Sequence, residues 1–522
     1  MTRLLAAALA FALVAALPAQ ARTFRFADQG DVVSMDPYFF NESFLINFTG
    51  NIYESLTGRG KKLEVTPELA TDWKQTAPTV WRFNLRKNVK FHDGTPFTAD
   101  DVIFSLERIR GEGSDLKSHV AEIREVRKID DHAIDIVTRA PFPILPEVIS
   151  IWRIMPKAWC EKNNSTRPSD VRKGIENHAS QNTNGTGPFI LKSRQAGVRT
   201  VLVPNPNWWG KAEHNLTEVI FTPIGNDATR VAALISGEID MMQPVPLQDV
   251  ARLSANPNLK VMQGAELRTV FLGMDQKRDE LMFSSVKGKN PFKDVRVRRA
   301  FYQAIDIEAI RKTTMRGASS PTALMVGPGI NGFTQEQNKR LPYDPEAARK
   351  LLSEAGYASG FEVGMMCPND RYVNDGEICQ AVAAMLARIG VKVNLTTESK
   401  ATYFSKILRR DTSFYMLGWT PSTYDSHNAI FSLIASPGEG GRGQFNLGQY
   451  ANARVDELAT AIAAESDAKK RQAMISEVFK LHHDEVGHLP LHQQVLSWGM
   501  KKNVELVQLA DNFNYLRWVV LK

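Results

Sequence analysis

Four histidines near the carboxyl end of the chain come closest, by residue type and spacing, to a catalytic or metal site. They are His482, His483, His488 and His492. Imidazole binds zinc and transfers protons, but a helical zinc pair needs two histidines four residues apart on one helix face. His483 and His488 are five apart, and Gly487 ends any helix before His492. The spacing favours surface and helix-end histidines over a metal site.

Motifs of the common catalytic classes are missing from the chain. There is no Gly-x-Ser-x-Gly elbow, no Walker loop, no Cys-x-x-Cys pair and no His-Glu-x-x-His helix. His92 and Asp93 would suit acid–base chemistry, but they open a turn with Gly94, where Asp and Gly serve the backbone. We therefore expect neither an enzymatic activity nor a cofactor.

The stretch from residue 80 to residue 110 contains the turn at His92-Asp93-Gly94 and the secondary-structure elements on either side of it. Trp81, Phe83 and Leu85 alternate with polar residues, which is the period of a strand with one buried face. A Gly-Thr-Pro turn follows, and Thr98 precedes Asp101 at the spacing of a capping box. A strand, a turn and a capped amphipathic helix are predicted in that order.

Helices and strands alternate along much of the remaining chain. Helices are predicted to be capped by Asp227 and Asp294, and another to start at Asp344 with Pro345 near its beginning. Strands are expected near the carboxyl end, at Gln494–Trp498 and Leu516–Leu521. This pattern predicts an α/β protein with helices covering mixed sheets.

The first 21 residues have the composition of a secretory signal peptide. Arg3 precedes an apolar run, and Ala19-Gln20-Ala21 forms a small-x-small cleavage site. Cleavage is therefore expected after Ala21. The remaining chain is too long for one ordinary core, which predicts two or three domains. The formal charge of +7 comes from basic residues interspersed with 57 acidic ones, so no nucleic-acid partner is expected.

Three cysteines, Cys160, Cys367 and Cys379, fall in the exported part of the chain. Export makes a disulfide chemically possible, and the odd count leaves at least one thiol free. Cys367 follows a strand-like stretch and Cys379 lies on a predicted helix. The two are either bridged or separately buried.

The central strand–turn–helix segment also carries a family resemblance. WRFNLRKNVKFHDGTPFTADDVIFSLER, from Trp81, closely resembles the signature segment of the bacterial extracellular solute-binding proteins of family 5. Similar segments recur in the family's order: NIYESLTG from Asn51, GTGPF from Gly185, NPNWWG from Asn205, ISGEID from Ile235, PFKDVRVRRAFYQAID from Pro291, YDPEAARKLLSEAGY from Tyr343 and GW from Gly418. Each motif is weak alone, and the ordered set covers nearly the whole mature chain.

The resemblance implies a two-lobe α/β periplasmic-binding-protein fold of the class II, cluster C type, with an added subdomain. The expected order is lobe I in residues 22–63, an inserted subdomain in 64–180, lobe I again in 181–269, lobe II in 270–488 and a return to lobe I in 489–522. Two chain crossings then act as a hinge. The resemblance also implies a periplasmic monomer that captures a small solute and delivers it to a membrane permease pair with a cytoplasmic ATPase.

The same resemblance points to a ligand cleft around residue 419. In peptide-binding members, a Trp after Gly and an Asp three residues later lie in the cleft, and the Asp holds the peptide's amino end. Here Trp419 follows Gly418, but Ser422 takes the Asp position, and a hydroxyl cannot form that charge-assisted bond. Asp425 either holds a cationic ligand group instead or orders its loop.

Arg371 stands before a predicted helix in a segment that borders the cleft in similar proteins. Arginine suits planar carboxylates, so Arg371 is the candidate for an acidic end of the ligand, with surface pairing to Asp370 or Asp375 as the alternative. Further ligand candidates are Tyr424, His427, Phe445, Asn446, Phe40 and Asn41.

A short or modified peptide is the favoured solute. Ser422 keeps open a non-peptide solute such as an opine, a sugar or a metal chelate. The histidine cluster keeps open a secreted hydrolase or metalloprotein.

Overall fold

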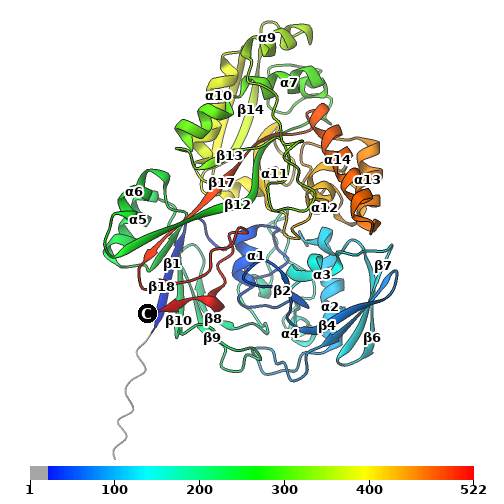
Figure 1. The fold of residues 1–522 in the computed structure, drawn as a ribbon, viewed down its shortest axis with the longest axis vertical. Coiled ribbons are helices and arrows are strands. Elements are labelled where there is room, and N and C mark those ends of the chain that lie inside the picture. Colours follow the sequence, from blue (N-terminus) through cyan, green and yellow to red (C-terminus); the bar gives the residue numbers. More distant parts are fainter. Residues whose placement is uncertain (1–21) are drawn as a thin grey trace, which may run out of the picture.

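The computed structural model describes residues 22–522. The predicted signal peptide, residues 1–21, lies outside the described residues. The chain forms two α/β lobes, stacked along the long axis of the molecule (Figure 1). Lobe II contains β14 (Phe361–Pro368), β15 (Val391–Glu398) and β16 (Phe414–Trp419). Lobe I contains the amino-terminal strand β1 (Thr23–Asp28) and the elements around it.

One mixed sheet runs through both lobes, in the order β15-β14-β16-β12-β17-β11-β1-β10-β9-β8. β1 is parallel to its neighbours β10 and β11, and β14 is parallel to β15 and β16, whereas the other pairs are antiparallel. The strands not yet given are β8 (Phe189–Gln195), β9 (Arg199–Pro204), β10 (Glu218–Pro223), β11 (Met241–Gln243), β12 (Leu259–Met274), β17 (Leu489–Lys501) and the short β13 (Ser319–Pro321), which pairs with β17.

The long strands β12 and β17 carry the chain between the lobes. The last residues of β12 pair with β16 of lobe II, and the last residues of β17 pair with β11 of lobe I. Their mutual register shifts between Ala265 and Thr269, midway along β12. Such an irregularity lets a ladder bend, which suits a hinge. The domain boundaries expected from the sequence stay predictions.

A second, antiparallel sheet extends lobe I. Its order is β4 (Ala70–Ala77), β5 (Val80–Leu85), β7 (Ala133–Thr138) and β6 (Ile123–Asp130). β5 and α2 (Ala99–Arg110) are the strand and helix predicted from their periodicity, and Thr98 and Asp101 form the predicted capping box. A small hairpin joins β2 (Thr57–Arg59) to β3 (Val65–Pro67). The Thr57 hydroxyl donates to the Pro146 carbonyl oxygen of α3 (Leu145–Val148), and α4 (Lys157–Lys162) follows α3 in the chain.

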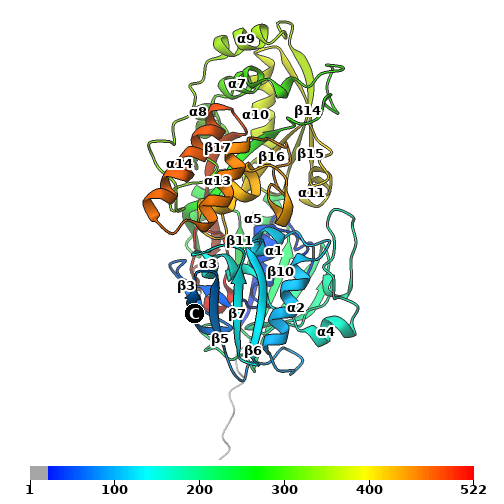
Figure 2. The ribbon, with the colours of Figure 1, turned by 90° about the vertical axis from the view of Figure 1, so that its right-hand side faces the viewer.

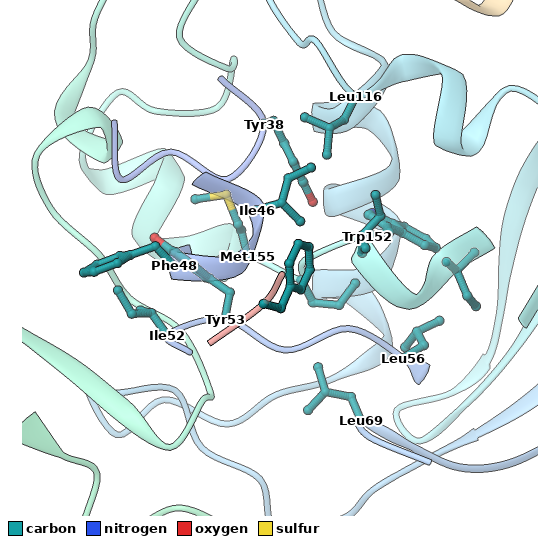
Figure 3. Close-up of a cluster of buried hydrophobic side chains, with 14 of the residues drawn as sticks. Tyr38, Ile46, Phe48, Ile52, Tyr53, Leu56, Leu69, Leu116, Trp152 and Met155 are labelled. Carbon is teal, nitrogen blue, oxygen red and sulfur yellow. The ribbon is translucent and has the colours of Figure 1, made fainter. Parts of the chain in front are cut away.

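The core of lobe I joins the first helix to the second sheet. Figure 3 shows Ile46 and Phe48 of α1 (Ser43–Thr49) among Tyr38, Leu56, Trp152 and other buried side chains. Trp152 and Tyr38 are fully buried. Because α1 is packed from several sides, the residues just before it are held at the junction of the lobes, where α1 lies in both views (Figure 1, Figure 2).

Helices cover the sheet in both lobes. Those of lobe II are α7 (Val295–Ala304), α8 (Ile307–Ala309), α9 (Pro345–Glu354), α10 (Asp375–Ala387), α11 (Lys400–Ile407), α12 (Ser426–Ala429), α13 (Ala453–Ala464) and α14 (Ala468–Asp484), and those of lobe I include α5 (Asp227–Ser236) and α6 (Val250–Ser254). Asp294 and Asp344 cap α7 and α9 as predicted. Asp227 does not cap α5, because the Asn226 side chain accepts the Thr229 amide and Asp227 becomes the first helical residue.

The predicted last strand, Leu516–Leu521, is wrong for most of its length. Residues Leu516–Trp518 form a 3₁₀ turn, and only β19 (Val520–Leu521) pairs, with β18 (Val504–Glu505). The reason is a tertiary contact. The Leu516 amide donates to the Asn51 side chain at 2.9 Å, so it is not free to join a strand ladder.

Cys367 and Cys379 form a disulfide between the end of β14 and α10, and Cys160 is a buried free thiol. This settles the alternative that the sequence left open. Burial raises the pKa of the Cys160 thiol to about 12, so the thiol is unreactive in the folded state.

Thiol titration tests this assignment. The folded protein is expected to react with no equivalent of a thiol reagent, the denatured unreduced protein with one, and the denatured reduced protein with three. Three reactive thiols in the denatured protein before reduction would contradict the bridge.

Among residues 22–522, none of the helices is both long and apolar enough to cross a membrane.

Candidate functional site

A cavity lies where the two lobes meet, and the centre of a water-sized sphere can occupy about 70 Å³ of it. Lobe I contributes the segment from Phe40 to Ser43 before and at the start of α1, and the carboxyl-terminal segment around Asp511. Lobe II contributes the end of β16, including Trp419, and the loop that follows it. A position between two lobes suits the enclosure of a small solute.

Seven of the ten residues predicted for the site line this cavity. They are Phe40, Asn41, Arg371, Trp419, Ser422, Tyr424 and Phe445. The other three, Asp425, His427 and Asn446, do not line it. Whether the seven contact a ligand stays a prediction.

Trp419 forms a fixed aromatic wall at the end of β16. Its Nε1 donates to Asn428 Oδ1 at 2.8 Å, and its ring centroid lies 4.9 Å from that of Phe445. Across the cavity, Phe40 of lobe I packs edge-on against Phe404 of lobe II at 4.9 Å. These rings present apolar surface to a solute from both lobes.

Arg371 makes an ion pair with Glu42 across the lobe junction. Arg371 Nη2 lies 2.7 Å from Glu42 Oε1, and both side chains are nearly buried. Pairing of the Arg371 side chain with Asp370 or Asp375 is therefore wrong. Asp375 accepts the Arg371 backbone amide instead, at 2.9 Å.

Glu42 also ends the loop before α1. Its carboxylate accepts the backbone amides of Phe44 and Leu45 and so caps the helix. Burial alone would raise the pKa of Glu42, but Arg371 and Lys400 outweigh it and lower this pKa to about 2. Glu42 is thus ionised at neutral pH and attracts lobe II. Glu42 was not predicted as a site residue, although an acidic residue directly before a helix is a recognisable sign of a helix cap.

Asp425 does not hold a cation in the cavity, because Arg471 already binds both oxygens of its carboxylate. Arg471 donates to both oxygens, at 2.7 and 2.6 Å, and Oδ1 also accepts the His427 amide. Burial opposes ionisation, but Arg471 keeps the pKa of Asp425 below its ordinary value. Asp425 therefore orders the loop and caps α12, which was the alternative interpretation.

His427 and Asn446 are also structural. The His427 ring is buried against Phe431, with Nε2 3.1 Å from the Ala459 carbonyl oxygen. Asn446 Nδ2 donates to the carbonyl oxygens of Ala435 and Tyr450. Neighbouring residues of the same loops line the cavity, but these two side chains are held inside the protein.

His482, His488 and His492 are buried, so the expectation of surface histidines is wrong for these three. His482 Nε2 lies 2.9 Å from His488 Nδ1, and burial lowers the pKa of both rings. Within residues 22–522, no group of three or more His, Cys, Asp or Glu side chains is placed to hold a metal ion.

Six further charged residues of the cavity wall were not predicted from the sequence: Arg59, Glu68, Arg153, Arg268, Asp511 and Arg517. They come from separate segments of the chain, and no motif marked any of them. Asp511 bridges the lobes, because its Oδ2 accepts the hydroxyls of Tyr424 and Tyr515 at 2.9 and 3.2 Å.

The carboxyl group of Asp511 is expected to titrate near pH 6. Burial raises its pKa to about 6 despite the hydrogen bonds that it accepts. Since this pKa lies above the ordinary value of 3.8, the group favours the folded state most at low pH and loses that contribution as the pH rises through about 6. The stability of Asp511→Asn relative to the wild type is therefore expected to increase as the pH rises from about 3.8 to about 6, and to stay higher above that pH.

Carbon NMR of the Asp511 carboxyl checks the pKa, and urea unfolding at several pH values checks the stability difference. Asp249→Asn, at a side chain away from the cavity, is the control. A carboxyl signal that titrates near pH 4 would contradict the prediction.

Comparison with known proteins decides the family. The model of the bacterial extracellular solute-binding proteins, family 5 Middle, matches residues 64–441, more than half of the chain. The chain belongs to this family. It is thus a solute-binding protein.

Relatives of this solute-binding protein match it almost end to end. The glutathione-binding protein GsiB of Salmonella typhimurium is 26% identical over 503 residues, which cover 94% of this chain and 93% of the relative. The dipeptide-binding protein of Escherichia coli is 24% identical and covers 95% of this chain and 93% of its own.

Solved structures of similar proteins share the fold. The periplasmic binding protein DppA of Helicobacter pylori, in complex with the peptide STSA, has a TM-score of 0.85 and 24% identity, with 96% of this chain and 98% of the other covered. AgaA of A. tumefaciens, in complex with agropinic acid, also has a TM-score of 0.85, with 22% identity and 96% and 99% coverage. The two-lobe α/β fold expected from the sequence is confirmed.

Proposed function

We propose that this solute-binding protein is the periplasmic component of an ABC-type importer and captures a short or modified peptide. The observation that carries the proposal is a cavity walled by charged and aromatic residues of both lobes. The glutathione- and dipeptide-binding names of its relatives support a peptide solute. A membrane permease pair with a cytoplasmic ATPase would receive the solute.

The mechanism is closure of two lobes on the solute. A solute that contacts both lobes stabilises the closed state over the open one. Phe40, Arg371 and Tyr424 make contacts between the lobes in the present arrangement. A solute between them adds its own contacts, and the closed form is what the permease recognises. No covalent bond is made, so the proposal includes neither an enzymatic activity nor a cofactor.

Export and release of a soluble monomer to the periplasm belong to the same proposal. The charged start, apolar run and small-x-small site of residues 1–21 support cleavage after Ala21. The extracellular character of the family agrees with export.

A second candidate function is capture of an opine or another non-peptide solute. Ser422 favours it, because this residue lines the cavity at the position where the family resemblance implies an Asp for the amino end of a peptide. Asp425 does not replace that Asp, because Arg471 already binds its carboxylate. A structural neighbour contains agropinic acid.

Mass spectrometry separates the two candidates. The mature protein, residues 22–522, is purified from its own periplasm without refolding, and the small molecules released on denaturation are analysed. Peptides of a narrow length range support the proposal, and one non-peptide compound supports the alternative. Absence of any bound molecule, together with no binding of a peptide library in calorimetry, would overturn the peptide function.

A further inference from the structure

The cavity wall carries an excess of positive charge. Five arginines and three acidic residues line it, so the formal excess is two positive charges. The arginines are Arg59, Arg153, Arg268, Arg371 and Arg517, and the acidic residues are Glu42, Glu68 and Asp511. A low-dielectric cavity of this kind attracts an anionic solute.

The acidic residues of the wall already have donors. Glu42 accepts Arg371 and two helix amides. Glu68 accepts the Ser55 amide at 2.8 Å and lies 3.4 Å from Arg517 Nη1. Asp511 accepts two tyrosine hydroxyls. These carboxylates have little capacity left for a cationic ligand.

The positive charges of the five arginines are balanced to different degrees by carboxylates and hydrogen-bond acceptors of the protein. Arg268 pairs with Glu266 at 2.9 Å and Arg371 with Glu42. Arg59 has no carboxylate partner, but its three nitrogens donate to Ser150 and to backbone carbonyls. Its guanidinium group is therefore engaged by the protein itself.

Arg153, in contrast, donates hydrogen bonds through only one of its three nitrogens, Nη1. It is 7% exposed and lines the cavity, yet no carboxylate of residues 22–522 lies within ion-pair distance of it. Its Nη1 donates to the Ser55 hydroxyl and the Ser150 carbonyl, and its Nε has no partner in this part of the chain. Burial lowers the pKa of Arg153, and the nearby Glu68 only partly opposes this effect.

Two neighbours of Arg153 support a built subsite. A Cβ on Gly50 would come within 2.4 Å of Arg153 Nη2, so the chain leaves room for the guanidinium beside α1. Arg517, which also lines the cavity, has an unpartnered Nε as well. A buried cation without a counter-ion is costly, and a ligand anion would remove that cost.

We infer that Arg153 and Arg517 form an anion subsite in lobe I, and that the solute is an acidic peptide with a second carboxylate for this subsite. Arg371 of lobe II receives the other carboxylate. A dianion would then contact both lobes and hold them closed. This inference rests on the proposed peptide function and adds the charge class of the solute.

Matched dipeptides test the inference by calorimetry on the mature protein. Ala-Glu is compared with Ala-Gln, and Glu-Ala with Gln-Ala, since each pair differs by one negative charge at nearly constant shape. The wild type is expected to prefer the Glu peptide of at least one pair by about tenfold or more, the lower range for a hydrogen bond to a charged group. In Arg153→Gln the preference is expected to fall to near one.

The ratio of two affinities is unaffected by the fraction of protein that is folded. Arg517→Gln, expected to reduce the preference partly, serves if Arg153→Gln does not fold, and Arg349→Gln on the exposed side of α9 is the control. Equal affinity for Glu and Gln peptides in the wild type overturns the inference but leaves the peptide function intact. A preference unchanged in both variants overturns the assignment of the subsite. Failure of all four dipeptides to bind, while a non-peptide compound binds, overturns the peptide function itself.

Discussion

Replacement of Asp36 by alanine is expected to lower the free energy of unfolding by about 3–5 kcal/mol, the range for removing one partner of a buried ion pair. The side chains of Asp36 and Arg108 are fully buried and share two hydrogen bonds, of 2.8 and 2.7 Å. The Ser169 amide and hydroxyl also donate to Asp36. Loss of the carboxylate leaves Arg108 charged in the core of lobe I.

The contribution of the Asp36 carboxylate to the free energy of unfolding is expected to depend on pH. Burial alone would raise its pKa, but Arg108 more than offsets this, and the pKa lies below its ordinary value. The stabilisation is therefore complete above the pKa of the unfolded chain and is lost as the pH falls through the folded-state pKa. Urea unfolding at several pH values measures both effects.

Two controls separate the unpaired charge from a general loss of packing. Glu477→Ala removes a carboxylate that pairs with Arg454 at the exposed surface, and it should leave stability nearly unchanged. The double variant Asp36→Leu, Arg108→Met removes both charges and should recover much of the loss. An Asp36→Ala variant as stable as the wild type would show that the Asp36–Arg108 ion pair does not contribute to the free energy of unfolding.

Local signals predicted the elements of this protein well. The alternation of Trp81, Phe83 and Leu85 and the spacing of Thr98 and Asp101 depend only on neighbouring residues, and β5 and α2 form where they indicate. The strand predicted at residues 516–521 failed because the amide of Leu516 is bound by Asn51, which lies in another segment. No local pattern contains that contact.

The site was predictable where a motif or a loop marked it. Trp419 and Arg371 were found through the family resemblance, and both line the cavity. The role of Asp425 could not be decided from the sequence, because its partner Arg471, 46 residues further on, has no recognisable spacing to it. Arg153 and Arg517 were missed for the same reason, since they meet only through the return of the chain to lobe I.

Replacement of Arg371 by alanine is expected to weaken solute binding by about 1.5–3 kcal/mol, or ten- to hundredfold in Kd, the range for a hydrogen bond to a charged group. Arg371 lines the cavity and also pairs with Glu42 across the lobes, so its loss is expected to affect both solute binding and closure. Calorimetry with the compound released from the native protein measures the change.

A second variant separates those two roles of Arg371. Glu42→Gln keeps a side chain that can cap α1 but removes the charge that attracts Arg371 and Lys400. If Arg371 holds the acidic end of the solute, Glu42→Gln weakens binding less than Arg371→Ala does, and Arg371→Lys restores only part of the affinity because lysine lacks the planar fork. Equal losses in Glu42→Gln and Arg371→Ala would assign Arg371 to closure alone. Unchanged affinity in Arg371→Ala would remove it from the site, and Arg349→Ala, at an exposed position of α9, controls for a general loss of positive charge.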